Sequence, residues 1–224
     1  MERIKKNDFV EIEFTGKAND KIFDTTFKKE AESMGLDVDV KPVIVSVGNK
    51  MLLKSFDEEL EGKEFGKKYN LHLTSEKAFG KRNPNLIKTM PIKIFHQQNM
   101  NPSPGMTVQL DQNIAKIISV SGGRVMVDFN NPLAGKDIEY EFKITKKIID
   151  NKEKVNALQD FFFRQRFDFY FKEDEKIKTK KVVFSDEKAK PFIELFKDNF
   201  KKIIGFDIEF GIKDKQSNQK DSSK

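Results

Sequence analysis

Phe23 and Asp24 place a large aromatic ring next to a carboxylate, inside the stretch FTGKANDKIFDTT of residues 14–26. Other groups that usually do chemistry are scarce, because the 224 residues include no cysteine and two histidines, His72 and His96. Disulfides, thiol nucleophiles and cysteine-ligated zinc are therefore excluded. We assign both histidines to surface or packing positions, and we predict no metal site and no cofactor. The chemistry that remains must therefore be modest.

The composition is typical of a soluble globular chain with a charged surface. Charged residues make up 35% and hydrophobic residues 37%, and the mean hydropathy is −0.63. No apolar run is long enough to cross a bilayer, and the start MERIKKNDFV has neither a secretory h-region nor the composition of a transit peptide. We therefore expect a cytoplasmic protein without a membrane partner.

The net charge of +6 is spread over the chain, which argues against a nucleic-acid partner. The densest basic run, KIKTKK at residues 176–181, directly follows the acidic KEDE and is typical of the solvated side of a strand. Binding to a phosphate backbone needs basic side chains gathered on one face, and the sequence shows no such stripe.

Hydrophobic periodicity predicts a first sheet and a short helix. Val10, Ile12 and Phe14 alternate with charged residues, as in a half-buried strand, and Gly16 is expected to begin a turn. Between residues 51 and 61, apolar residues recur every three or four positions, which indicates a helix. Further elements are an exposed loop with room for a helical turn at residues 28–41, and strands at residues 43–47, 69–73 and 138–144.

A separate small β-module is predicted over residues 86–129. After a short helix and the loop NMNPSPG, three β-runs follow in close succession, TVQL, NIAKIISV and RVMVDF. Exposed methionine, isoleucine and valine on short strands would offer an adaptable apolar surface, with Met90, Met100 and Met106 as candidate contacts. The alternative is a purely structural insertion.

Residues 150–212 are predicted to form an α-β-β-α-β domain with its own core, because twelve of the twenty-two phenylalanines lie after residue 150. Its longest helix is expected over residues 186–204, with Gly205 as the C-terminal cap. The polar tail of residues 213–224 is expected to be disordered. These elements place the whole chain in the α+β class.

Four motifs, in order and correctly spaced, resemble those of FKBP-type peptidyl-prolyl cis-trans isomerases: FTGKANDKIFDTT, LLKSFDEEL, AFG and NPLAGKDIEYEF. The β-module resembles the insert-in-flap chaperone domain of the SlyD-like branch, and the C-terminal unit is similar to that of long archaeal members. The resemblance implies an antiparallel sheet wrapped around a short helix, formed by residues 1–85 plus 130–149. The client-binding module then covers residues 86–129, followed by the C-terminal domain of residues 150–212 and the tail.

The resemblance implies an enzyme that accelerates rotation about Xaa-Pro bonds without covalent chemistry. The barrier of about 18–20 kcal/mol is lost amide resonance, so an apolar cleft that favours the twisted amide lowers it. By resemblance, the catalytic residues are Asp24, Phe23, Phe79 and Tyr140, and the substrate-binding residues are Phe14, Leu52, Leu53, Phe56 and Leu133. The implied partners are unfolded or nascent proline-containing polypeptides.

Two positions depart from the family pattern, which usually has tyrosine where this chain has Phe14 and Phe79. The missing hydroxyls imply that Asp24 is less restrained and that the substrate is less anchored. A hydrogen bond to a charged group is worth about 1.5–3 kcal/mol, so a slower isomerase is expected. Asn131 replaces a common histidine, and the tail lacks the histidines and cysteines with which some relatives bind nickel.

Two other functions stay open at this point. A chain that kept the fold but lost efficient catalysis could act as a non-enzymatic holdase chaperone or adaptor. The C-terminal domain could instead dock the protein on a ribosome or on a second copy, and a large exposed apolar face there would favour this.

Overall fold

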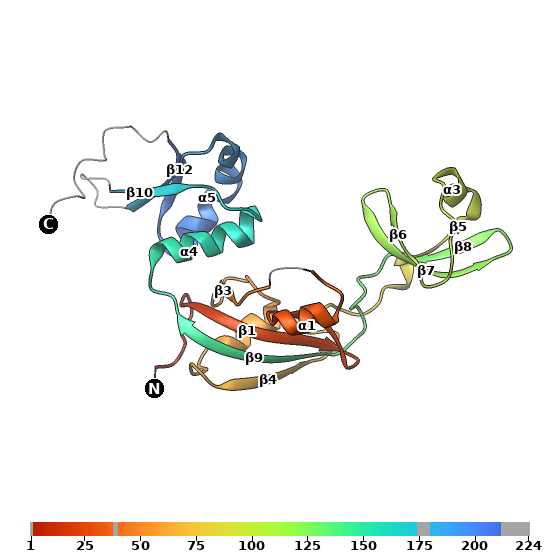
Figure 1. Cartoon of the computed structure of the whole chain (residues 1–224), viewed down its shortest axis with the longest axis horizontal. Helices are drawn as coiled ribbons and strands as arrows, with labels where there is room; N and C mark the ends of the chain where they lie inside the picture. The colour runs from red at the N-terminus through yellow and green to blue at the C-terminus, as the bar shows by residue number, and fades with distance from the viewer. Residues whose placement is uncertain (1, 38–39, 174–179, 212–224) are drawn as a thin grey trace. The chain divides into compact units, whose positions relative to one another are not determined.

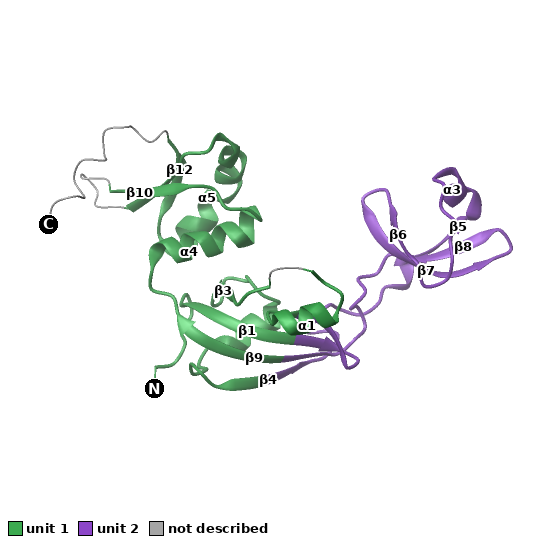
Figure 2. Ribbon diagram, viewed as in Figure 1, with its two compact units in different colours: residues 1–15, 25–69, 141–224 green, residues 16–24, 70–140 purple. Residues whose placement is uncertain are grey.

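Three β-sheets with accompanying helices make up the computed structural model, which describes residues 2–37, 40–173 and 180–211 (Figure 1). The chain divides into two compact units, which are unit 1 with residues 1–15, 25–69 and 141–224, and unit 2 with residues 16–24 and 70–140 (Figure 2). Strands and helices are mixed, which confirms the predicted α+β class. The predicted tail of residues 213–224 lies outside the described residues, as does residue 212.

The largest sheet has the strand order β2-β1-β9-β4, and β3 also pairs with β1. Its strands are β1 (Phe9–Ala18), β2 (Lys21–Thr25), β3 (Val43–Ser46), β4 (Lys68–Leu73) and β9 (Ile138–Lys147). β3 runs antiparallel to β1, with Val10 opposite Val45 and Ile12 opposite Val43. Val10 and Ile12 are fully buried, as their alternation with charged residues predicts.

Two helices belong to the same part of unit 1, α1 (Lys28–Ser33) and α2 (Lys54–Leu60). The Phe56 ring of α2 packs edge-on against Phe14 of β1 and Phe142 of β9, with ring centroids 6.0 and 4.9 Å away. Edge-to-face pairs of this kind add to the free energy gained by burial. The predicted combination of a sheet and a short helix is confirmed.

The turn predicted at Gly16 is wrong, because β1 continues through Gly16 to Ala18. The chain turns instead at Asn19 and Asp20, whose φ angles are 50° and 60°. Asparagine and aspartate tolerate this left-handed region better than most residues, and two such residues between strands form a tight hairpin. β2, which the sequence pattern did not indicate, follows directly.

The inserted module is a four-stranded antiparallel sheet in unit 2, with the order β5-β8-β7-β6. Its elements are η1 (Pro84–Leu86), β5 (Ile87–Pro91), α3 (Ile92–Gln97), β6 (Thr107–Leu110), β7 (Asn113–Ser121) and β8 (Arg124–Asp128). Phe95 of α3 is fully buried among alternate strand residues, Val108, Leu110, Ala115, Ile117, Val125 and Val127. The three predicted β-runs are confirmed, and β5 is a fourth strand that its proline-ended sequence concealed.

The C-terminal elements of unit 1 form a sheet of order β10-β11-β12, with β10 antiparallel and β12 parallel to β11. They are α4 (Asn151–Leu158), the π-turn η2 (Gln159–Phe163), β10 (Phe169–Glu173), β11 (Lys180–Phe184), η3 (Glu187–Ala189), α5 (Lys190–Ile204) and β12 (Asp207–Phe210). The Phe163 ring lies 5.7 Å from Phe184 and 5.4 Å from Phe200, centroid to centroid. The predicted α-β-β-α-β order is confirmed, and Gly205 ends α5 with a φ of 75°.

Candidate functional site

Three aromatic side chains of unit 2 form the Phe23 ring group, which consists of Phe23, Phe79 and Tyr140. The Phe23 ring meets each of the other two edge-on, with centroids 5.9 Å apart in both pairs. Gly16 lies against the group, since a Cβ added there would come within 2.8 Å of Tyr140 and 2.9 Å of Phe23. Glycine is therefore needed at this position for close approach of the rings, and not for a turn.

Asp24 supplies a negative charge close to the Phe23 ring group. Burial, and in second place the charge of the Asp24 carboxylate, raise the pKa of Tyr140 to about 12. Tyr140 therefore keeps its hydroxyl proton at neutral pH and can donate it in a hydrogen bond. Tyr140 is 6% exposed whereas Asp24 is exposed, so the pair combines a buried donor with a charge in water.

The FDTT segment is held by hydrogen bonds that no sequence pattern indicated. The hydroxyls of Thr15 and Thr25 both donate to the Glu30 carboxylate of α1, at 2.5 and 2.7 Å. The N–H of Phe14 donates to Oγ1 of Thr26 at 2.9 Å, and the N–H of Thr26 donates to the Phe14 carbonyl at 3.0 Å. Both threonines of FDTT are thus anchors of the backbone that follows the candidate catalytic pair.

The predicted substrate-binding residues of unit 1 lie on β1 and at the start of α2. Phe14 is 6% and Phe56 1% exposed, so these two rings present little surface to solvent. Leu52 and Leu53 are half-buried in the segment that leads into α2. These two leucines are therefore more accessible than Phe14 and Phe56.

Asp57 of α2 holds the segment that leads into this helix, although no pattern in the sequence singled out this residue. Its carboxylate is buried and accepts the N–H groups of Gly48 and Lys50, at 2.9 and 2.8 Å. The Leu53 carbonyl accepts the N–H of Asp57 at 2.9 Å, which begins the helix. A buried carboxylate is stable only with such partners, so Asp57 is a structural residue.

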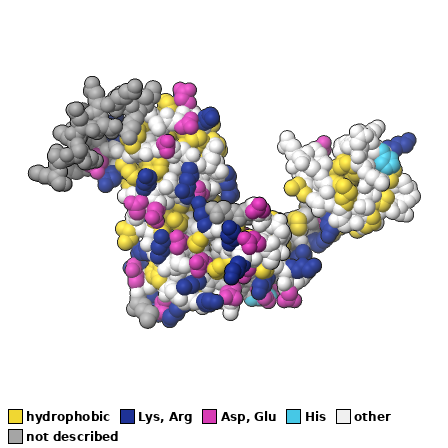
Figure 3. Space-filling view, viewed as in Figure 1, with side chains coloured by type: hydrophobic (Ala, Val, Ile, Leu, Met, Phe, Trp, Pro, Cys, Tyr) yellow, Lys and Arg dark blue, Asp and Glu magenta, His cyan; other side chains and the backbone are white. Residues whose placement is uncertain are grey.

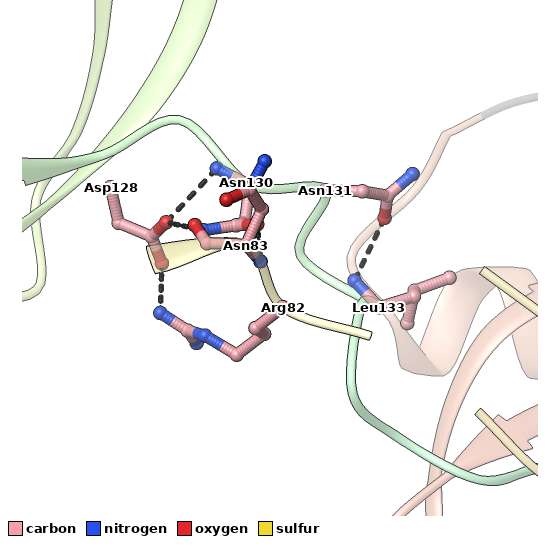
Figure 4. Close-up of polar contacts among 6 residues, drawn as sticks. All are labelled: Arg82, Asn83, Asp128, Asn130, Asn131 and Leu133. Carbon is pink, nitrogen blue, oxygen red and sulfur yellow. Dashed lines mark hydrogen bonds and ion pairs between the residues drawn. The ribbon is translucent and has the colours of Figure 1, made fainter. Parts of the chain in front are cut away.

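Leu133 is half-buried in the loop NPLAGK of unit 2, which is held by hydrogen bonds. Oδ1 of Asn131 accepts the N–H of Leu133 at 2.8 Å (Figure 4). The N–H of Gly135 donates to the Gly80 carbonyl at 2.8 Å, which ties this loop to the segment that carries Phe79. Asn131 thus shapes an Asx turn.

The strands of the inserted module expose apolar side chains on the face opposite the module's core. Ile114 and Ile118 of β7 are 70% and 40% exposed, and Met126 of β8 is 39% exposed. Figure 3 shows hydrophobic side chains at the surface of this module, with few charged ones among them. A patch of this kind favours contact with another apolar surface.

The methionines predicted as contacts are only partly on this surface. Met106 is 37% exposed, but Met90 and Met100 pack against the buried core of the module, so the prediction is wrong for these two. The reason is that this face of the sheet carries the buried core around Phe95 of α3. Strict alternation along β7 and β8 would have identified Ile114 and Met126 instead.

Within the described ranges, no three histidine, aspartate or glutamate side chains gather where a metal ion could bind. His72 is exposed and lies 3.8 Å from carboxylates of both Asp137 and Glu139, and His96 is exposed too. Among the same residues, no helix has the length and apolarity that a membrane crossing requires.

Comparison with known proteins agrees with the fold. The family model of FKBP-type peptidyl-prolyl cis-trans isomerases matches residues 1–96, and that of the FKBP26 IF domain matches residues 88–133. The short-type peptidyl-prolyl cis-trans isomerase of Methanocaldococcus jannaschii is 31% identical over 144 residues, which are 63% of this chain and 92% of that protein. The FKBP-type isomerase SlyD of Aeromonas hydrophila is 28% identical over 122 residues, 54% of this chain and 58% of its own length. The FKBP-type 16 kDa isomerase of Escherichia coli is 26% identical over 148 residues, 64% and 93% of the two chains.

The chain belongs to the FKBP-type peptidyl-prolyl cis-trans isomerase family. It is an enzyme of this family with SlyD-like relatives, and its substrates are proline-containing polypeptides. The resemblance seen in four short motifs is thereby confirmed. The assignment of catalytic and substrate-binding residues and the domain boundaries stay predictions.

Proposed function

We propose that the chain binds a prolyl ring against the Phe23 ring group and accelerates Xaa-Pro rotation by favouring the twisted amide. The observation that carries this proposal is the close packing of Phe23, Phe79 and Tyr140 beside the charge of Asp24. Twisting removes the resonance that makes the amide polar, so apolar surroundings disfavour the planar forms. An enzyme that binds the twisted form more tightly than either planar form lowers the barrier.

Each predicted residue has a role in this proposal. Asp24 orients the amide through its charge, and Tyr140, which keeps its proton, donates to a substrate carbonyl. Apolar contacts to the substrate come from Phe14, Leu52, Leu53, Phe56 and Leu133. Phe79 supplies a wall of the site but no hydroxyl, so we propose a slower enzyme than relatives with tyrosine there.

The inserted module holds unfolded or nascent clients in the cytoplasm through the apolar face that carries Ile114, Ile118 and Met126. Its support is the exposure of these side chains on short strands. A client held there has its prolyl bonds at a high local concentration near the enzyme, which raises turnover without any new contact to the prolyl ring.

One experiment separates this function from a non-enzymatic holdase. The exchange rate of a short Xaa-Pro peptide is measured by NMR with the intact chain, and aggregation of an unfolded protein is followed in parallel. Both are repeated with residues 88–128 replaced by a short loop. The proposal predicts that the replacement abolishes protection from aggregation and leaves peptide exchange in place. A holdase would suppress aggregation and give no acceleration over buffer even when intact.

A partner for the C-terminal domain is a second proposal, supported by apolar side chains that face solvent in unit 1. Leu195 of α5 is 70% exposed, and Phe171 of β10 is 38% exposed. A ribosome and a second copy of the chain are the two candidate partners. Sedimentation of the intact chain and of Leu195→Lys, both in the absence of ribosomes, distinguishes them. If the partner is a second copy, the intact chain sediments as an oligomer and the variant does not.

A further inference from the structure

The two chain segments that enter and leave the inserted module are joined by a polar group that we call the stalk cluster, which consists of Arg82, Asn83, Asp128 and Asn130 (Figure 4). The N–H of Asn83 donates to Oδ1 of Asn130 at 2.8 Å, and Nδ2 of Asn130 donates to the Asn83 carbonyl at 3.1 Å. These reciprocal bonds turn two separate segments into one stalk.

Asp128 is the centre of the stalk cluster. Its carboxylate accepts the backbone N–H of Asn130 at 2.9 Å and its side-chain N–H at 2.7 Å, and it pairs with the Arg82 guanidinium. Burial works against its charge, but these hydrogen bonds and Arg82 prevail and hold the pKa of Asp128 below its ordinary value. Asp128 is also the last residue of β8, opposite Ile87 of β5, so it anchors the base of the module.

Arg82 links this anchor to the loops that carry predicted site residues. Its aliphatic stem lies on Gly135, where an added Cβ would come within 3.2 Å of Cγ of Arg82. Gly135 is in the loop of Leu133 and is hydrogen-bonded to Gly80, the neighbour of Phe79. The Arg82 side chain therefore contacts the loop of Leu133 through its aliphatic stem and the inserted module through its guanidinium group.

We propose that Arg82 and Asp128 are positioning residues that set how the module presents a bound client to the Phe23 ring group. The inference rests on the proposed roles of that group and of the module. Neither residue is among the proposed catalytic or substrate-binding residues, and the pair lies at the stalk and not on the apolar face of Ile114. Its effect is therefore on transfer of a held client, and neither on capture nor on rotation of a small substrate.

The test compares Arg82→Gln and Asp128→Asn with Lys81→Gln. Lys81 is the matched control, because it is the next residue and its exposed ion pair, at 2.5 Å, is with Glu76, outside the module. Three quantities are measured for each full-length variant: kcat/KM for a short Xaa-Pro peptide, Kd for a permanently unfolded proline-free protein, and kcat and KM for proline-limited refolding of a protein.

Arg82→Gln and Asp128→Asn are expected to lower kcat for refolding about tenfold, since the benefit of a linked site depends on geometry. KM, Kd and the short-peptide rate stay within about twofold, because neither residue lies on the apolar face of Ile114 or belongs to the Phe23 ring group. Arg82→Lys, which keeps the charge, recovers part of the loss, and Lys81→Gln behaves as the unmodified chain.

Equal refolding rates for Arg82→Gln and Lys81→Gln would overturn the inference. A lower kcat for refolding would also overturn it if Kd for the unfolded protein became weaker or the short-peptide reaction became slower. In that case the stalk cluster would only stabilise the fold. If Asp128→Asn unfolds, the comparison of Arg82→Gln with Arg82→Lys decides alone. If the unmodified chain is inactive on the short peptide, the proposed function and this inference are both overturned. If the unmodified chain is active and the variants refold the protein at the same rate as it does, only this inference is overturned.

Discussion

The Phe23 ring group and the inserted module use apolar side chains in opposite ways. In the ring group Tyr140 is 6% exposed, and Gly16 leaves no room for even one more carbon atom beside two rings. In the module Ile114 is 70% exposed on an open strand face. A site for one prolyl ring gains from a shape that exists before the substrate arrives, whereas capture of varied unfolded chains gains from an adaptable surface. Under the proposed function, selection of the bond and capture of the client are therefore separate tasks with separate residues.

The largest effect that tests this contrast is expected from Asp24→Ala. Loss of a charge that acts on the amide is worth about 1.5–3 kcal/mol, so kcat/KM for a short Xaa-Pro peptide falls about 10- to 100-fold. Protection of an unfolded protein from aggregation stays unchanged. Asp198→Ala, at an exposed position of α5, is the control and leaves both assays unaffected. An Asp24→Ala chain with normal peptide activity would remove Asp24 from the site.

The reverse effect is expected from the double variant Ile114→Lys, Ile118→Lys. Two charges on the apolar face weaken Kd for an unfolded protein at least about tenfold, because tenfold corresponds to about 1.4 kcal/mol and one fully buried isoleucine alone contributes about 1.5–3 kcal/mol. The short-peptide rate stays the same. Gln109→Lys is the matched control, because Gln109 lies directly opposite Ile114. This substitution adds a charge without removing apolar surface. Equal weakening by the control would assign the effect to charge alone.

Phe79→Tyr sharpens the description of the ring group. Phe79 is half-buried, so a hydroxyl there can reach a substrate carbonyl, and one neutral hydrogen bond is worth about 0.5–1.5 kcal/mol. We expect kcat/KM for the short peptide to rise about three- to tenfold, with KM lowered. Phe27→Tyr, at a position that is 42% exposed, serves as control. A fall in activity would show that Phe79 works through packing only.

The smallest effect concerns stability at alkaline pH. Because the folded pKa of Tyr140 is about 12, above the ordinary value, its stabilising effect is complete below pH 10 and is lost as the pH rises from 10 to 12. The loss measured by urea unfolding should be about 1–2 kcal/mol. Tyr140→Phe lacks this step, so the difference between the two chains isolates it from other groups. Parallel curves for both chains would place Tyr140 in a less buried setting.

Local periodicity was enough to predict much of the fold. Val10 and Ile12 alternate with charges and are buried, and the long C-terminal helix ends at Gly205 as its sequence indicates. The failures are local sequences whose role depends on distant partners. Gly16 looked like a turn residue, but rings from Phe23 and Tyr140 require it. No spacing along the chain could have shown this.

The candidate site could likewise be predicted in part: residues within recognisable motifs were found, and residues that depend on distant partners were not. The resemblance of four motifs to those of the family pointed to Phe23, Phe79 and Tyr140, and the structure brings these three rings together. The pair of Arg82 and Asp128 could not be predicted from the sequence, because the two residues are 46 positions apart and neither residue type is unusual on a surface. Side chains that act through other residues leave no pattern in a single sequence.

The central claim is that rotation of the prolyl bond and capture of the client are separable. The most direct measurement is kcat/KM for a short Xaa-Pro peptide and for proline-limited refolding of a protein, with the intact chain, Asp24→Ala, and Ile114→Lys, Ile118→Lys. The account predicts that Asp24→Ala lowers both values and that the isoleucine double variant lowers the refolding value alone. An intact chain that does not accelerate peptide exchange, or a double variant that slows both reactions equally, would contradict it.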